Sequence, residues 1–164
     1  MLAVILHIVY FVILFLAFLQ DWKFRAIHWG IFFLLAVVGV GINWGGDGME
    51  LLAILTKLLF VLAVMSCLFL YISLKEGRFI NLFKAHFGIG DLLFFLATVP
   101  IFKTENYVLF FISGLLISAL VHALISIKKE GVTIPLAGYL ALYILLLKGI
   151  ELSTSFNPFH HSIL

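Results

Sequence analysis

Charged residues and cysteine are scarce in this chain of 164 residues. Only 11% of the residues are charged, and the net charge of +2 is too small to indicate binding to nucleic acid. The one cysteine, Cys67, excludes an internal disulfide bond and a zinc site built from several cysteines. No linker, internal repeat or low-complexity tract divides the chain, so we expect residues 1–164 to form a single domain.

Hydrophobic residues take the place of the missing charges. They make up 65% of the chain, and the mean hydropathy is +1.27, which is typical of a membrane protein. The first apolar run, Met1 to Leu19, covers roughly 30 Å as a helix, the thickness of the hydrocarbon core. We therefore predict an all-α protein, a polytopic membrane bundle of six transmembrane helices. The predicted spans lie near residues 1–20, 27–44, 51–74, 87–102, 107–127 and 132–147.

The basic residues predict how these spans are oriented. If the connection at 21–26 lies in the cytoplasm, seven basic residues fall on that side and two fall outside, in line with the positive-inside rule. The seven are Lys23, Arg25, Lys75, Arg78, Lys84, Lys128 and Lys129, and the two are Lys103 and Lys148. Lys57 lies inside the third span, where we expect its side chain to snorkel toward the membrane surface.

The same topology sorts the acidic residues. Two spans separate Asp21 from Asp91, and an even number of crossings returns the chain to the same membrane face. Four acids fall on the opposite face: Asp47, Glu50, Glu105 and Glu151. Glu76 and Glu130 share the face of the aspartates but lie in hydrophilic loops that contain lysine. Asp21 and Asp91 are therefore the acids that we expect to meet.

Asp91 stands in an unfavourable place for a charge. Residues Leu92 to Phe102 are too few to span a membrane before Lys103, so the helix has to include residues 87–91 and draws Asp91 below the surface. An ionised carboxylate at the middle of a bilayer costs about 2.5–3.5 kcal/mol. A helix N-cap is the structural alternative for Asp91, and an ordinary residue at the end of a span is the alternative for Asp21.

A pair of carboxyl groups held away from water suits aspartyl proteolysis. The two groups cannot both ionise easily and tend to share one proton. The ionised partner activates a water molecule, and the protonated partner polarises the scissile carbonyl group and donates to the leaving amine. Gly88 and Gly90 carry no side chain beside Asp91 and let a substrate backbone approach closely. Arg25 follows Asp21 by four residues, so on a helix it faces the same side and can hold that carboxylate ionised or bind lipid phosphate.

Three stretches of the chain resemble the type IV prepilin peptidase family, membrane aspartyl proteases that trim leader peptides from pilin-like precursors. The family's first aspartate opens a stretch similar to 21-DWKFRAIHW-29, and its second lies in a motif matched by 88-GIGD-91. A later family segment resembles 134-IPLAGYLAL-142, in which Pro135 keeps its place and the glycine is displaced to Gly138. The resemblance implies that Asp21 and Asp91 are catalytic and that Gly88, Gly90, Arg25 and Pro135 bind or position the substrate.

The chain also departs from the family pattern. His28 and Trp29 stand where Pro-Asn usually follows, and Leu93 replaces a lysine that is often found after the second aspartate. These changes affect the choice of precursor more than the pair of aspartates. The chain has neither the cysteines nor the room for the cytoplasmic insert that is linked to methylation in longer members, so we expect a minimal peptidase without methyltransferase activity.

The resemblance implies an enzyme of the inner (plasma) membrane with its active site on the cytoplasmic side. Such an enzyme cuts after a glycine, between a short basic leader and a hydrophobic helix, and uses no cofactor or metal. Its partners are the prepilin-like precursor of a type IV pilus or secretion system and the membrane lipids.

Two other functions compete with this one. A presenilin-like intramembrane protease also uses a GxGD aspartate, but Gln20 precedes Asp21 where that family usually has tyrosine. A small transporter or proton relay could use Asp91, but it needs further acids along its route, and the predicted spans 107–127 and 132–147 contain none. His7 and His122 lie within spans, where we expect a neutral histidine to hydrogen-bond to a neighbouring helix.

The predicted orientation can be tested by labelling with a reagent that does not cross the membrane. A cysteine introduced as Lys129→Cys should react only from the cytoplasmic side, and one introduced as Gly46→Cys should react only from outside, because seven basic residues oppose two. The reverse pattern would overturn a cytoplasmic site, yet it would leave Asp21 and Asp91 on one face.

Overall fold

The computed structural model describes residues 2–44, 50–77, 88–126 and 135–153. Within these ranges the chain forms six α-helices and one short 3-10 helix and contains no strand. They are α1 (Leu2–Phe24), α2 (Trp29–Ile42), α3 (Leu51–Glu76), α5 (Ile89–Thr98), η2 (Val99–Ile101), α6 (Thr104–Ser126) and α7 (Leu136–Ser153). The all-α prediction is therefore confirmed for the described part of the chain.

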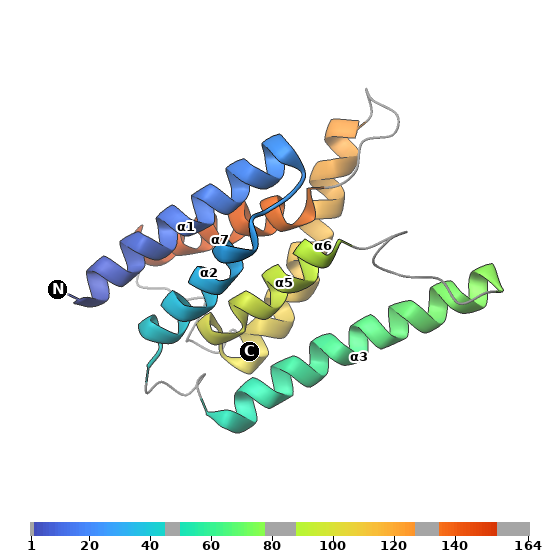
Figure 1. Cartoon of the computed structure of the whole chain (residues 1–164), viewed down its shortest axis with the longest axis horizontal. Coiled ribbons are helices and arrows are strands. Elements are labelled where there is room, and N and C mark those ends of the chain that lie inside the picture. The colour runs from blue at the N-terminus through green and yellow to red at the C-terminus, as the bar shows by residue number, and fades with distance from the viewer. Residues whose placement is uncertain (1, 45–49, 78–87, 127–134, 154–164) are drawn as a thin grey trace.

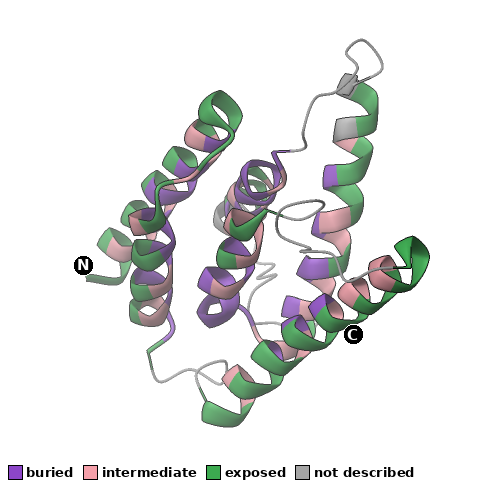
Figure 2. Cartoon of the chain, turned by 45° about the vertical axis from the view of Figure 1, so that its right-hand side comes forward, coloured by how far each residue is buried: buried purple, intermediate pink, exposed green. Residues whose placement is uncertain are grey.

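Three of the described helices are long and apolar enough to cross a membrane: α1, α3 and the stretch Thr104–Val121 of α6. Helices α2 and α5 are apolar but shorter. Large apolar side chains are exposed along the outer faces of α1, α2 and α3, while buried residues face the inside of the bundle (Figure 2). This distribution suits a molecule surrounded by hydrocarbon, because lipid accepts exposed apolar side chains at no cost.

Helices α1 and α7 form the central contact of the bundle (Figure 1). On α1 the buried residues include Tyr10, Leu14, Ala17 and Asp21, which recur every three or four positions and so share one face of the helix. α2 packs against both α1 and α5, and α6 packs against α7. The inward stripe of α1 thus carries Asp21 into the interior as its last member.

Helix α3 contacts the bundle along a narrow line and its second half projects away from the other helices (Figure 1). Its only buried residues are Lys57, Val61 and Met65, spaced four residues apart. Lys57 does not snorkel: its side chain is fully buried, and Nζ donates to the carbonyl oxygens of Val99 at 2.9 Å and Phe102 at 2.8 Å. The snorkelling prediction was wrong because the carbonyl groups at the C-terminal end of α5–η2 bind the Lys57 ammonium group inside the protein.

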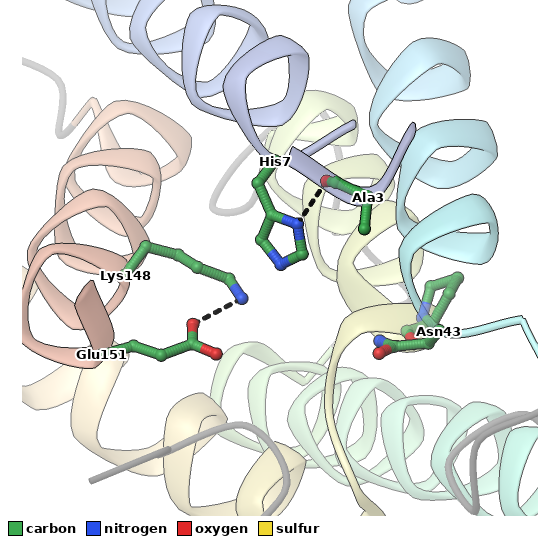
Figure 3. A network of polar contacts seen from close by, with 6 residues as sticks. Ala3, His7, Asn43, Lys148 and Glu151 are labelled. Carbon is green, nitrogen blue, oxygen red and sulfur yellow. Dashed lines mark hydrogen bonds and ion pairs between the residues drawn. The ribbon is translucent and has the colours of Figure 1, made fainter. Parts of the chain in front are cut away.

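The last helix is also longer at its C-terminal end than its apolar run predicts. α7 continues to Ser153, so Lys148 lies within the helix rather than after it and is buried, and its Nζ lies 2.6 Å from Glu151 Oε2. Figure 3 shows this ion pair on the side of α7 that faces α1, with His7 pointing toward it. Residues 132–147 contain no acid, but α7 carries Glu151 beyond the predicted end of that span. The expectation that His7 bonds to a neighbouring helix was wrong, because its Nδ1 lies 2.7 Å from the carbonyl oxygen of Ala3 in its own helix.

Several residues named from the sequence lie outside the described ranges. They are Gly46, Asp47, Arg78, Lys84, Lys128, Lys129 and Glu130. The same holds for the side chain of His122.

Candidate active site

Asp21 is held at the end of α1 by the turn that follows it. The helix ends at Phe24, and Arg25 adopts the left-handed conformation (φ 54°) while its backbone N–H donates to the carbonyl oxygen of Asp21 at 3.0 Å. Next along the chain, the N–H of His28 donates to Gln20 Oε1 at 3.0 Å. These two bonds close the turn, and Asp21, only 8% exposed, points inward.

His28, at a position where prepilin peptidases usually have Pro-Asn, has a structural role at the start of α2. His28 is the N-cap of α2, and its Nδ1 accepts a hydrogen bond from the N–H of Gly30 at 3.2 Å. The replacement thus starts α2 by a side-chain cap, and Gln20 ties that start to the end of α1.

Asp91 lies in the first turn of α5. Gly88 is the N-cap, so Asp91 is the third helical residue, and its carboxylate accepts a hydrogen bond from the backbone of Gly88. A Cβ at position 88 would lie 2.9 Å from Asp91 Oδ2, which explains the glycine there. At Gly90 a Cβ would meet only the ring of Phe32, at an ordinary contact distance of 3.8 Å, so packing does not require a glycine at this position.

The N-terminus of α7 brings the two aspartates together. The backbone N–H of Ala137 donates to Asp91 Oδ1 at 2.9 Å, and the N–H of Gly138 donates to Asp21 Oδ2 at 2.6 Å. Pro135, buried just before the helix, has no N–H and accepts the first helical bond from Tyr139 at 3.0 Å. The free N–H groups of a helix start attract negative charge, so this end of α7 suits two carboxylates.

The two carboxylates are close together because their donors are neighbours in the chain. Consecutive backbone nitrogens are less than about 4 Å apart, which places the bonded oxygens of Asp21 and Asp91 within about 10 Å of each other. Gly138 permits the approach of Asp21, since a Cβ there would lie 3.0 Å from Oδ2 and 3.1 Å from the Cβ of Asp21.

Arg25 is the remaining predicted site residue. It is exposed and lies in the turn after α1, so the helical spacing that would place it on the same side as Asp21 does not apply. Glu76, the other described acid predicted on this membrane face, is exposed at the end of α3. Among residues 2–44, 50–77, 88–126 and 135–153, no group of three or more His, Cys, Asp or Glu side chains is placed to bind a metal ion.

Sequence reasoning missed the backbone donors of α7. Nothing in a sequence marks the N–H of Ala137 as functional, but the proline and glycine of 134-IPLAGYLAL-142 signal a helix start that something approaches closely. Tyr139 was missed as well: it is 7% exposed, and its ring meets Trp22 edge-on at a centroid distance of 6.2 Å.

Comparisons with protein-family models, curated proteins and solved structures find no match for this chain.

The geometry of the pair predicts crosslinking in membranes. In a Cys67→Ser background, the double variant Asp21→Cys/Asp91→Cys should be joined by a short bifunctional thiol reagent, because both positions face consecutive N–H groups of α7. Asp21→Cys/Glu76→Cys is the control, since the end of α3 lies apart from the end of α1 (Figures 1 and 2). A failure of the first pair with every reagent up to about 10 Å, the width of one packed helix, would contradict the arrangement.

Proposed function

We propose that this chain is a membrane aspartyl endopeptidase that removes the leader from prepilin-like precursors, with Asp21 and Asp91 as its catalytic pair. The observation that carries the proposal is the convergence of these two aspartates, from α1 and α5, on neighbouring N–H groups of α7. The resemblance of 21-DWKFRAIHW-29, 88-GIGD-91 and 134-IPLAGYLAL-142 to the prepilin peptidase family supports it, because these three stretches supply the whole cluster.

The proposed reaction uses one shared proton. The ionised carboxylate takes a proton from a water molecule as the water oxygen attacks the peptide carbon, and the protonated carboxyl group polarises the carbonyl oxygen. That second group then gives its proton to the leaving nitrogen, so the pair again holds one proton when the bond has broken. The α7 N–H groups bind one oxygen of each aspartate and fix both side chains before a substrate arrives.

The arrangement favours a peptidase over a proton relay across the membrane. Lys148 and Glu151 do supply titratable groups toward the other end of α7. Between them and the aspartates, however, the α1–α7 contact is made by apolar residues that are completely buried. These are Leu14 and Ala17 on α1 and Leu140, Ala141 and Ile144 on α7. A proton relay needs titratable groups or water along its route, whereas the side chains of this buried layer are hydrocarbon and cannot carry a proton.

The proposed enzyme crosses the inner membrane six times and works on its cytoplasmic side. The count of seven basic residues against two supports the proposed orientation. α2 and the α5–η2 pair each rise about 20 Å, so we expect them to cross as short helices. Arg25, exposed beside the site, is placed for lipid phosphate or for the substrate flank, in keeping with a membrane-bound precursor.

Removing either carboxyl group should abolish cleavage. Asp21→Asn or Asp91→Asn keeps an oxygen that can accept the α7 hydrogen bond, so folding should be normal, while the titrating proton is lost. Each variant should lose nearly as much activity as the double variant because the two groups act as a unit. The measurement is the gel shift of a coexpressed precursor whose basic leader ends in glycine.

Glu76→Gln is the matched control for these variants, since Glu76 is an exposed acid expected on the same membrane face. It should process the precursor at the wild-type rate. If either asparagine variant also did so, the aspartyl mechanism would have to be abandoned, and proton flux into vesicles would become the next measurement.

A glycine substitution tests the placement of Asp21 without touching a carboxyl group. Gly138→Ala puts a Cβ 3.0 Å from Asp21 Oδ2, and the resulting shift should lower the cleavage rate by about 100-fold if it approaches 1 Å. Gly149→Ala on the same helix gains the same helix propensity but meets nothing within 4 Å, so its rate should stay unchanged. Equal rates for both variants would contradict the role assigned to the Asp21–Gly138 contact.

A further inference from the structure

The C-terminal end of α5 presents carbonyl oxygens inside the protein, among buried side chains such as Val99, Ile101 and Phe102. α5 passes into η2 at Val99, and the chain leaves the helical conformation at Phe102. Four carbonyl groups of this end receive side-chain donors, and all of these donors come from residues with buried side chains. Irregular backbone is tolerated inside a membrane only where protein groups satisfy it in this way.

The donors come from three different helices and from the segment itself. Lys57 of α3 binds the oxygens of Val99 and Phe102, and Asn43 of α2 binds the oxygen of Pro100 at 2.8 Å (Figure 3 shows Asn43). Tyr107 of α6 and Thr98 both bind the oxygen of Phe95 at 2.9 Å. Lys57 is the one cation in this set, and a positive charge at a helix C-terminus is favoured by the helix dipole.

The α5–η2 segment is therefore a short rod fixed at both ends. Asp91, near its start, accepts from Ala137 of α7, and the oxygens that Lys57 binds begin at Val99, about 12 Å farther along the helix axis. The middle of the rod is held by apolar packing of residues such as Phe94 and Phe95, and by one hydrogen bond from another helix, that of the Tyr107 hydroxyl to the carbonyl oxygen of Phe95. Such packing resists sliding along the helix axis less than directed hydrogen bonds do, because it has no preferred direction.

We propose that Lys57 is a positioning residue for the aspartate pair: by holding the C-terminal carbonyl groups of α5–η2, it fixes how far Asp91 reaches toward α7 and Asp21. The inference rests on the proposed function for its consequence in cleavage, whereas its geometric part stands apart from it. Lys57 touches neither aspartate. It acts by fixing the position of the α5–η2 segment, so its loss should change the placement of Asp91. The rate of the chemical step should therefore change more than the affinity for substrate.

Crosslinking tests the geometric part without any need for cleavage. In the Cys67→Ser, Asp21→Cys/Asp91→Cys protein, the Asp91–Ala137 bond is already absent, so Lys57, Asn43 and Tyr107 remain as the polar anchors that other helices supply to the rod. Lys57 binds two of the four carbonyl groups. Adding Lys57→Met, which keeps the length of the side chain and removes the charge, should slow crosslinking by about tenfold or more. Lys75→Met is the matched control, because Lys75 is an exposed lysine on the same helix, and it should leave the crosslinking rate unchanged.

Lys57→Arg decides the question if Lys57→Met does not fold. Arginine keeps a cation but presents a larger, planar group, so crosslinking should slow several-fold while the protein stays monodisperse in detergent. Crosslinking at the unmodified rate in the folded methionine variant, or in the arginine variant where methionine does not fold, would overturn the proposal.

Cleavage kinetics test the functional part on the protein with both aspartates present. Lys57→Met should lower kcat by about 100-fold with little change in KM, since a misplacement near 1 Å is costly in the chemical step. A normal kcat for this variant would overturn the positioning role. If the wild-type protein cleaved no precursor, the proposed function would be wrong. The crosslinking rates would still decide whether Lys57 positions Asp91.

Discussion

The free N–H groups at the start of α7 are the constraint on which the rest of the structure depends. Away from water each unsatisfied backbone group is costly, and a helix that begins among buried residues, as α7 does, has to find acceptors there. The acceptors are carboxylates from α1 and α5, and these in turn need donors because an ionised carboxylate is costly in the same surroundings. The N–H groups thus gain acceptors and the carboxylates gain donors. Two hydrogen bonds in this way connect α1, α5 and α7, which are distant in sequence.

At the opposite end of α5, backbone groups again bind side chains from other helices, but the backbone groups are acceptors and the side chains are donors. There the unsatisfied groups are carbonyl oxygens, and they are met by Lys57 and Asn43 instead of acids. Polar side chains of this apolar chain thus gather where a helix begins or ends inside the bundle. Lys148 and Glu151 are the exception, because they neutralise each other within α7. Most of the few buried charges therefore have a position that the backbone explains.

Sequence patterns predicted the helical architecture, because apolar runs depend on chain order alone. They also led to the expectation that Asp21 and Asp91 meet, and both carboxylates do bond to consecutive N–H groups of α7. They did not predict where a helix ends when the residues on both sides are apolar or weakly polar. α1 stops at Phe24, which takes Arg25 off the helix, and α7 runs past Lys148. Nor did they predict the burial of Lys57, since the partner of a lone charge is supplied by another helix and is visible only in three dimensions.

The depth of the carboxylate pair bears on how an aspartyl protease can meet both water and a membrane substrate. Asp21 is 8% exposed, yet the residues directly after it, including Trp22 and Phe24, are exposed at the end of α1. The pair therefore lies about one helical turn inside the protein boundary at this end of the bundle. In the proposed function, a precursor with a basic leader in the cytoplasm and an apolar helix in the bilayer carries its junction at that same boundary. Hydrolysis there needs no transfer of water to the membrane centre and no extraction of the substrate helix, which is a physical reason for building the site from helix ends rather than from the middle of a span.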